Sequence, residues 1–132
     1  MNDRSSPIRL ENAGIVVSER ANYSYVLRGI ATAWAEVTEV EVHFMLLDSR
    51  GDHFKTLSHT QKTTLKSGNS LLLDRFSFAR SGPWTAEAGE VKQFATSVSF
   101  VARVQKSDGT EWIADTRGIV QEIQALKSKV TK

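Results

Sequence analysis

Most of the chain alternates between apolar and polar residues with a period of two, which is the pattern of half-buried β-strands. In the clearest segment every second residue from Val40 to Leu46 is apolar, and Glu39, Glu41 and His43 stand between or before them. Further apolar segments begin near residues 8, 23, 54, 71, 94 and 110. About seven strands, spaced about ten residues apart, favour an all-β fold built as an antiparallel β-sandwich.

Turn-forming residues separate these apolar segments. Residues 48–52 and 65–70 are rich in Asp, Ser, Asn and Gly, and Asp108 followed by Gly109 is a hairpin signal. Residues 80–91 contain Gly82, Pro83 and Gly89 and predict the longest loop.

The period changes near residue 116 and becomes helical. Four apolar residues follow the spacing i, i+4, i+7 and i+11, and Asp115 or Thr116 can cap the first turn. We expect one domain over residues 1–132, with the sandwich over 8–115 and an amphipathic C-terminal α-helix over 116–131. A lone helix of this length is marginal in water, so its apolar stripe needs a surface to bury it: the chain's own sheet or the same helix of a second copy.

The alternation also predicts which residues face the core. The set expected between the two sheets holds one parity on two long strands: Val40, Val42, Phe44, Leu46, Phe94, Val98 and Phe100. Met45 and Leu47 have the opposite parity and predict an apolar patch on an outer face, covered by the helix or by a second subunit. The predicted partner-binding residues are therefore Met45, Leu47, Ile119, Ile123, Leu126 and Val130.

A family resemblance rests on two motifs in the middle of the chain. The segment from Phe44 to Asp48 reads Phe-Met-Leu-Leu-Asp, and the segment from Leu65 to Ser70 reads Leu-Lys-Ser-Gly-Asn-Ser before an apolar strand that holds Phe76. Over residues 29–78 this order resembles the FxLYD-type immunoglobulin-like domains of bacteria and archaea. The resemblance implies an immunoglobulin-like sandwich in an accessory or extracytoplasmic setting, and it implies no catalytic residues. The chain has Leu47 where the family has tyrosine and Ser67 where it has proline.

Composition removes several classes of function. The 132 residues contain no cysteine, which excludes a disulfide scaffold, a thiolate zinc site and a cysteine nucleophile. A net charge of +2 lacks the basic surplus of a nucleic-acid-binding body, so no nucleic-acid partner is expected. No apolar run is long enough for a membrane span. The polar N-terminus predicts a cytoplasmic protein as written, or an extracytoplasmic one if a leader has been removed.

Candidate chemistry in the sequence is sparse. Glu41 and His43 share a strand face as a two-residue metal pair, but no third ligand follows at a suitable spacing, and a solvated sheet face explains both. There is no Gly-x-Ser-x-Gly nucleophile motif and no phosphate-binding glycine loop. We therefore predict no catalytic, metal or cofactor-binding residues, and a non-catalytic binding or structural module that contacts another protein or self-associates as a homodimer.

The aromatic residues carry the alternative interpretation. Trp84 follows Gly82 and Pro83 in the long loop, and with Tyr23 or Tyr25 it would form the platform of a carbohydrate-binding module. A small enzyme ranks third. We expect Trp34 to belong to the core and Trp112 to pack under the C-terminal helix.

Overall fold

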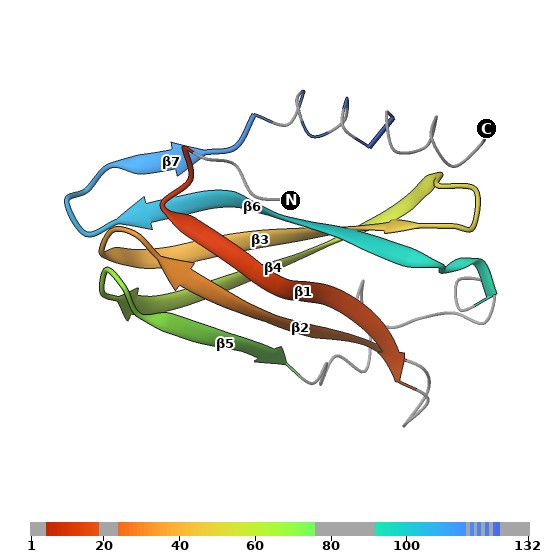
Figure 1. Cartoon of the computed structure of the whole chain (residues 1–132), viewed down its shortest axis with the longest axis horizontal. Helices are drawn as coiled ribbons and strands as arrows, with labels where there is room; N and C mark the ends of the chain where they lie inside the picture. Colours follow the sequence, from red (N-terminus) through yellow and green to blue (C-terminus); the bar gives the residue numbers. More distant parts are fainter. Residues whose placement is uncertain are drawn as a thin grey trace.

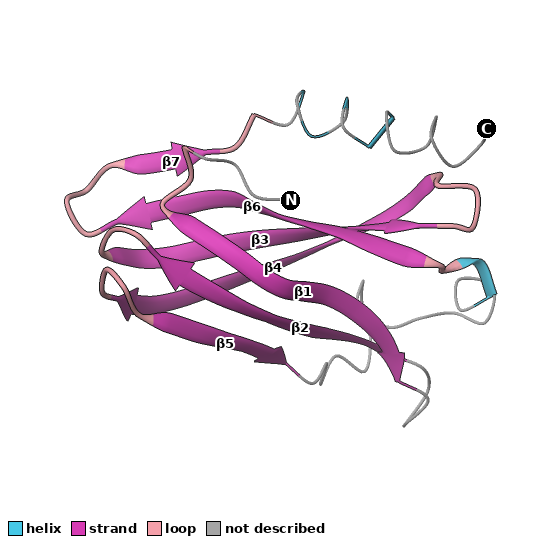
Figure 2. Ribbon diagram, viewed as in Figure 1, coloured by secondary structure: helices cyan, strands magenta, loops and turns pink. Residues whose placement is uncertain are grey.

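A computed structural model describes residues 5–18, 24–75 and 92–115, together with residues 117, 119, 121, 123 and 124. Within these ranges the alternating segments form two antiparallel β-sheets (Figures 1 and 2). The strands are, in chain order, β1 (Ile8–Ser18), β2 (Ser24–Ala33), β3 (Val37–Leu47), β4 (His53–Leu65), β5 (Ser70–Arg75), β6 (Thr96–Lys106) and β7 (Glu111–Ile113). The predicted all-β, seven-strand sandwich is thus confirmed at the level of the sheets.

The two sheets differ in size and exchange strands along the chain. Sheet A has the order β1-β2-β5, and sheet B has the order β4-β3-β6-β7. After the β3–β4 hairpin the chain crosses to sheet A, where β5 pairs with β2, and then returns to sheet B, where β6 pairs with β3. These crossings place the two sheets face to face and enclose the core between them.

The core follows the alternation of β3. Val40, Val42, Phe44 and Leu46 are each at most 1% exposed and belong to the main hydrophobic cluster, as predicted. The cluster takes its sheet A members from the inner faces of β1 and β2, and its remaining sheet B members from the start of β3 and from β4 and β6: Ile8, Leu10, Ile15, Tyr25, Leu27, Ala31, Ala33, Val37, Leu57, Leu65, Val101 and Val104.

Strand β6 corrects part of the predicted core. Between Glu41 and Val42 the β3–β6 register slips by one residue, so that Ala102 is the extra residue of a β-bulge. A one-residue slip reverses the facing of the strand beyond it. Val98 and Phe100 therefore pair with Met45 and His43 on the outer face, and the prediction that they lie between the sheets is wrong.

The inner face of β6 instead carries small residues where β1 crosses it. Ser97 and Ser99 pair with Leu46 and Phe44, and the hydroxyl of Ser97 accepts a hydrogen bond from the backbone N–H of Ile15 at 3.2 Å. Phe94, just before β6, is half-buried against the core, with its ring edge-on to a core tyrosine. The prediction that Phe94 belongs to the core is therefore confirmed in part.

A second bulge shapes sheet A. Asn12 and Ala13 are the residues of β1 that stand between Glu11, paired with Ile30, and Gly14, paired with Arg28. Asn12 has a φ of 52°, a left-handed conformation that asparagine tolerates better than most residues. The bulge brings the β1 backbone close to β2, and the residue opposite it is a glycine.

No complete C-terminal helix is found among the described residues. Of the predicted helix over 116–131, only Arg117, Ile119, Gln121, Ile123 and Gln124 are described, and their backbone is helical (Figure 2). Leu126 and Val130 lie outside the described residues, so the helix stays a prediction. Among the residues that the structure describes, we find no helix with the length and apolar character that crossing a membrane requires.

Candidate functional site

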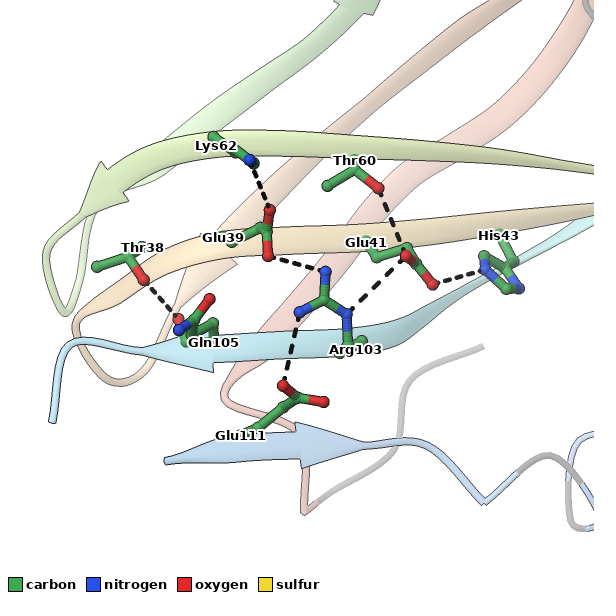
Figure 3. Close-up of polar contacts among 9 residues, drawn as sticks. All are labelled: Thr38, Glu39, Glu41, His43, Thr60, Lys62, Arg103, Gln105 and Glu111. Carbon is green, nitrogen blue, oxygen red and sulfur yellow. Dashed lines mark hydrogen bonds and ion pairs between the residues drawn. The ribbon is translucent and has the colours of Figure 1, made fainter. Parts of the chain in front are cut away.

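The outer face of sheet B carries a group of charged side chains contributed by all four of its strands (Figure 3). The alternation that buries Val40 and Val42 turns Glu39, Glu41 and His43 outward, and the register places Arg103 directly opposite Glu41. We define the Arg103 cluster as Glu39, Glu41, His43, Lys62, Arg103 and Glu111.

Arg103 is the centre of this cluster because three carboxylates surround its guanidinium. Its Nη2 donates to Oε2 of Glu39 at 2.8 Å, its Nε lies 3.9 Å from Oε1 of Glu41, and its Nη1 lies 3.6 Å from Oε2 of Glu111. These acids come from β3 and β7, the two strands that flank β6, so one side chain ties three strands together.

The remaining members attach at the rim. Lys62 on β4 lies 4.0 Å from Glu39, and Nε2 of His43 lies 2.9 Å from Oε2 of Glu41. The hydroxyl of Thr60 also donates to Glu41, at 3.4 Å. Because every carboxylate faces a cation or a donor, the arrangement has the character of an ion-pair network that fixes strand register.

The electrostatics agree with this interpretation. The side-chain hydrogen bond to Glu39 raises the pKa of Arg103 above its usual value, and the negative charges of Glu39, Glu111 and Glu41 add to that effect. Glu39 is the most enclosed acid, with 12% of its side chain exposed. Glu41 and His43, the predicted two-residue metal pair, bond to each other, and no group of three or more His, Asp or Glu suited to a metal occurs in the described part of the chain.

Beyond the charged cluster the same outer face becomes apolar. Met45, Leu47, Val98 and Phe100 follow along β3 and β6, and the ring of Phe100 contacts that of His43 edge-on with centroids 5.5 Å apart. Leu47 and Phe100 are only 7% and 5% exposed, yet neither belongs to the main core cluster. The patch predicted at Met45 and Leu47 is therefore on the outer face, and part of it is covered within one chain.

The C-terminal residues show the same intrachain burial. Ile123 is buried and Ile119 half-buried, while Arg117, Gln121 and Gln124 between and around them are exposed. Ile123 does not belong to the main core cluster either. Of the predicted partner-binding set, Leu47 and Ile123 are thus enclosed by their own chain, and Met45 and Ile119 are partly accessible.

The platform predicted for a carbohydrate ligand is not present at Tyr25. That ring is 0% exposed, packs edge-on against Phe94 at a centroid distance of 6.1 Å, and has Nζ of Lys55 5.3 Å from its centroid. Tyr25 therefore belongs to the core, because its parity on β2 turns it inward. Tyr23 and Trp84 lie outside the described residues.

Trp34 corrects another prediction. It was expected in the core, but it is 60% exposed in the connection between β2 and β3. Its backbone is held on both sides: its N–H donates to the carbonyl of Pro7 at 2.8 Å, and its carbonyl accepts from the hydroxyl of Ser67 at 2.8 Å. The indole of Trp34 is therefore exposed, while hydrogen bonds fix the position of its backbone.

Three connections meet around this tryptophan, and we name them the Trp34 end: residues 34–36, 66–69 and 107–110. Backbone bonds join them, from Gly68 N–H to Ala33 carbonyl at 2.8 Å and from Ser107 N–H to Glu36 carbonyl at 3.1 Å. In Figure 1 they lie together at the end of the sandwich where β2, β4 and β6 finish. Hydrogen bonds from the hydroxyl and backbone N–H of Thr110 lower the pKa of Asp108 and stabilise the third connection.

The roles of two surface residues, Arg103 and Trp34, were missed in the sequence, and only Arg103 had a usable signal. Arg103 has the parity of an outer residue next to a strand of glutamates, which pointed to ion pairing. Trp34 ends an apolar run and gave no such signal. Trp112, in β7, packs partly against the main core, and its indole N–H donates to the hydroxyl of Ser5 at 3.1 Å. Its predicted packing under the helix is untested.

Comparisons of the chain with protein-family models, with curated proteins and with solved structures find no match, so the resemblance to FxLYD-type domains stays a prediction.

Proposed function

We propose that the protein is a non-catalytic binding module that contacts another protein through the Trp34 end. The observation that carries this proposal is the 60% exposure of Trp34 on a backbone fixed by hydrogen bonds at both its N–H and its carbonyl. Tryptophan is enriched among the residues that dominate protein–protein binding energy, and a preorganised anchor loses little conformational entropy on binding.

The surroundings of Trp34 support a protein partner. Glu36, Lys66 and Asp108 are exposed and carry both signs of charge, which suits the polar rim of an interface around an aromatic anchor. The strand order also supports the proposal of an immunoglobulin-like arrangement. Immunoglobulin-like sandwiches present their binding loops together at one end, and the three connections of the Trp34 end lie together in the same way.

The test compares capture of partners by the full chain and by Trp34→Ala. Leu72→Ala is the matched control, because Leu72 is 67% exposed on β5 and lies outside the Trp34 end. Proteins cross-linked to the wild type in a lysate of the native host should be retained by Leu72→Ala, and their recovery should fall at least about ten-fold with Trp34→Ala. Both variants should melt at the wild-type temperature, since both side chains are largely in solvent.

Two results would contradict the proposal. Equal recovery with Trp34→Ala and wild type would remove the Trp34 end as the contact surface. Binding to a glycan array that disappears in Trp34→Ala would favour a carbohydrate-binding module instead, because an exposed indole can also stack on a sugar.

A further inference from the structure

The turn that joins β6 to β7 contains the bond from Asp108 to Gly109, and Figure 1 shows this turn at one end of the sandwich. Both residues are exposed, and Gly109 has a φ of 90° with open space where a Cβ atom would stand. A glycine has no side chain to shield its backbone nitrogen, so the carboxyl group of a preceding aspartate can approach that nitrogen. The pair that forms the hairpin is therefore also a chemically reactive pair.

Such a pair can rearrange in water without an enzyme. The nitrogen of Gly109 attacks Cγ of the protonated Asp108 side chain, a C–N bond forms, and a carboxyl C–O bond breaks with release of water. The five-membered imide then takes up a water molecule. Addition at Cγ breaks the new C–N bond and restores aspartate. Addition at the main-chain carbonyl carbon breaks the original peptide bond instead and leaves isoaspartate, which has the same atoms but an extra carbon in its main chain.

The folded turn holds both reacting groups in unreactive states. Oδ1 of Asp108 accepts hydrogen bonds from the hydroxyl of Thr110 at 2.5 Å and from its backbone N–H at 2.9 Å. These two bonds lower the pKa of Asp108 and keep its side chain an ionised carboxylate, which resists attack because it cannot release water. The N–H of Gly109 donates to the carbonyl of Lys106 at 3.2 Å, which keeps the proton on the attacking nitrogen.

The hydroxyl of Thr110 is the part of this restraint that a substitution can remove by itself. The N–H of Lys106 donates to the carbonyl of Thr110 at 2.9 Å, so the main chain closes the hairpin without help from that side chain. Thr110 is exposed, and replacing its hydroxyl by a methyl group leaves the core untouched. A hydrogen bond to an ionised carboxylate is of the stronger, charge-assisted kind, so its loss should be measurable.

We propose that Asp108 is a modification site at which the Asp108–Gly109 bond rearranges to isoaspartate, and that the hydroxyl of Thr110 restrains this reaction. The product lengthens the main chain of residues 107–110, where the N–H of Ser107 donates to the carbonyl of Glu36. The modification therefore alters the Trp34 end. This inference concerns the chain by itself, so it holds whether or not Trp34 binds a partner.

The test incubates the folded chain at neutral pH in water enriched in heavy oxygen and then digests it with trypsin in ordinary water. Each passage through the imide leaves a heavy oxygen in the tryptic peptide of residues 107–117, and fragmentation of that peptide distinguishes Asp108 from Asp115. The free peptide of the same sequence is the unfolded reference. Asp108 in the folded chain should react at least about ten-fold more slowly than in the free peptide, because both bonds to its carboxylate depend on the turn.

Two substitutions at one position locate the restraint. Thr110→Val should raise the rate in the folded chain at least about three-fold, because one of the two bonds to the carboxylate is lost. Thr110→Ser is the matched control, since it keeps the hydroxyl, and it should react at the wild-type rate. The corresponding free peptides should all react at equal rates, so that any difference between the chains comes from the fold.

Three results would overturn the inference. The first is a folded wild-type chain that reacts as fast as the free peptide, and the second is a Thr110→Val chain that reacts at the wild-type rate. The third is the absence of heavy oxygen at Asp108 of the Thr110→Val chain by the time the free peptide has reacted completely. Circular dichroism at the incubation temperature verifies that each chain is folded. If Thr110→Val does not fold, Thr110→Ala replaces it with the same expected increase.

Discussion

At the residue scale, the close approach of β1 and β2 depends on Gly29. A Cβ atom at this position would lie 3.0 Å from both the Cα and the Cβ of Ala13, and one of those atoms is backbone that cannot rotate away. Gly29→Ala should therefore lower the free energy of unfolding by about 1–3 kcal/mol, measured by urea denaturation.

Gly14 provides the matched control for that substitution. A Cβ there would meet only the hydroxyl of Ser97 at 3.6 Å, an ordinary contact distance. Gly14→Ala should change stability by less than about 0.5 kcal/mol. A loss at Gly14 as large as that at Gly29 would show that the bulge at Asn12 and Ala13 is not packed as described.

At the element scale, Arg103 fixes the register of β6 between β3 and β7. Arg103→Met removes the partner of a largely enclosed Glu39 and leaves three carboxylates facing one another, so stability should fall by about 1–3 kcal/mol. Lys62→Met removes an exposed, distant partner and should cost less than about 0.5 kcal/mol. Thermal unfolding of both variants at low and high salt would measure the difference.

The pKa of Arg103 sets the sign of its pH dependence. Because the pKa of Arg103 is raised in the folded state, the guanidinium contributes its full stabilisation at every pH below its ordinary pKa and loses that stabilisation only as the pH rises through the higher folded value. The difference between wild type and Arg103→Met should therefore not decline between pH 7 and pH 10. A decline in that range would assign the effect to another group.

At the scale of the whole molecule, part of the apolar outer face and one C-terminal residue, namely Leu47, Phe100 and Ile123, are buried within one chain. Ile123→Ala should lower stability by about 2–3 kcal/mol, while Gln121→Ala, at an exposed neighbouring position, should have almost no effect. The loss for Ile123→Ala should be the same at every protein concentration. A melting temperature that rises with concentration would show that a second copy supplies the burial instead.

How much of this molecule the sequence alone specified depends on the range of each interaction. The period-two pattern of Val40 to Leu46 is local, so it identified β3 and its inner face correctly. The turn residues placed the hairpin at Asp108 for the same reason, since a turn is set by a few adjacent dihedral angles. The outward glutamates of β3 also followed from parity alone.

Only the tertiary structure decided on which side of sheet B the residues of β6 lie and whether Trp34 is buried or exposed. A single extra residue at Ala102 reverses the side on which Phe100 lies, and the pairing with β3 rather than local pattern creates that bulge. Trp34 is exposed because the connections that surround it come from distant parts of the chain and hold its backbone at the end of the sandwich. Periodicity groups residues by face, whereas burial is determined by what the rest of the chain places over that face.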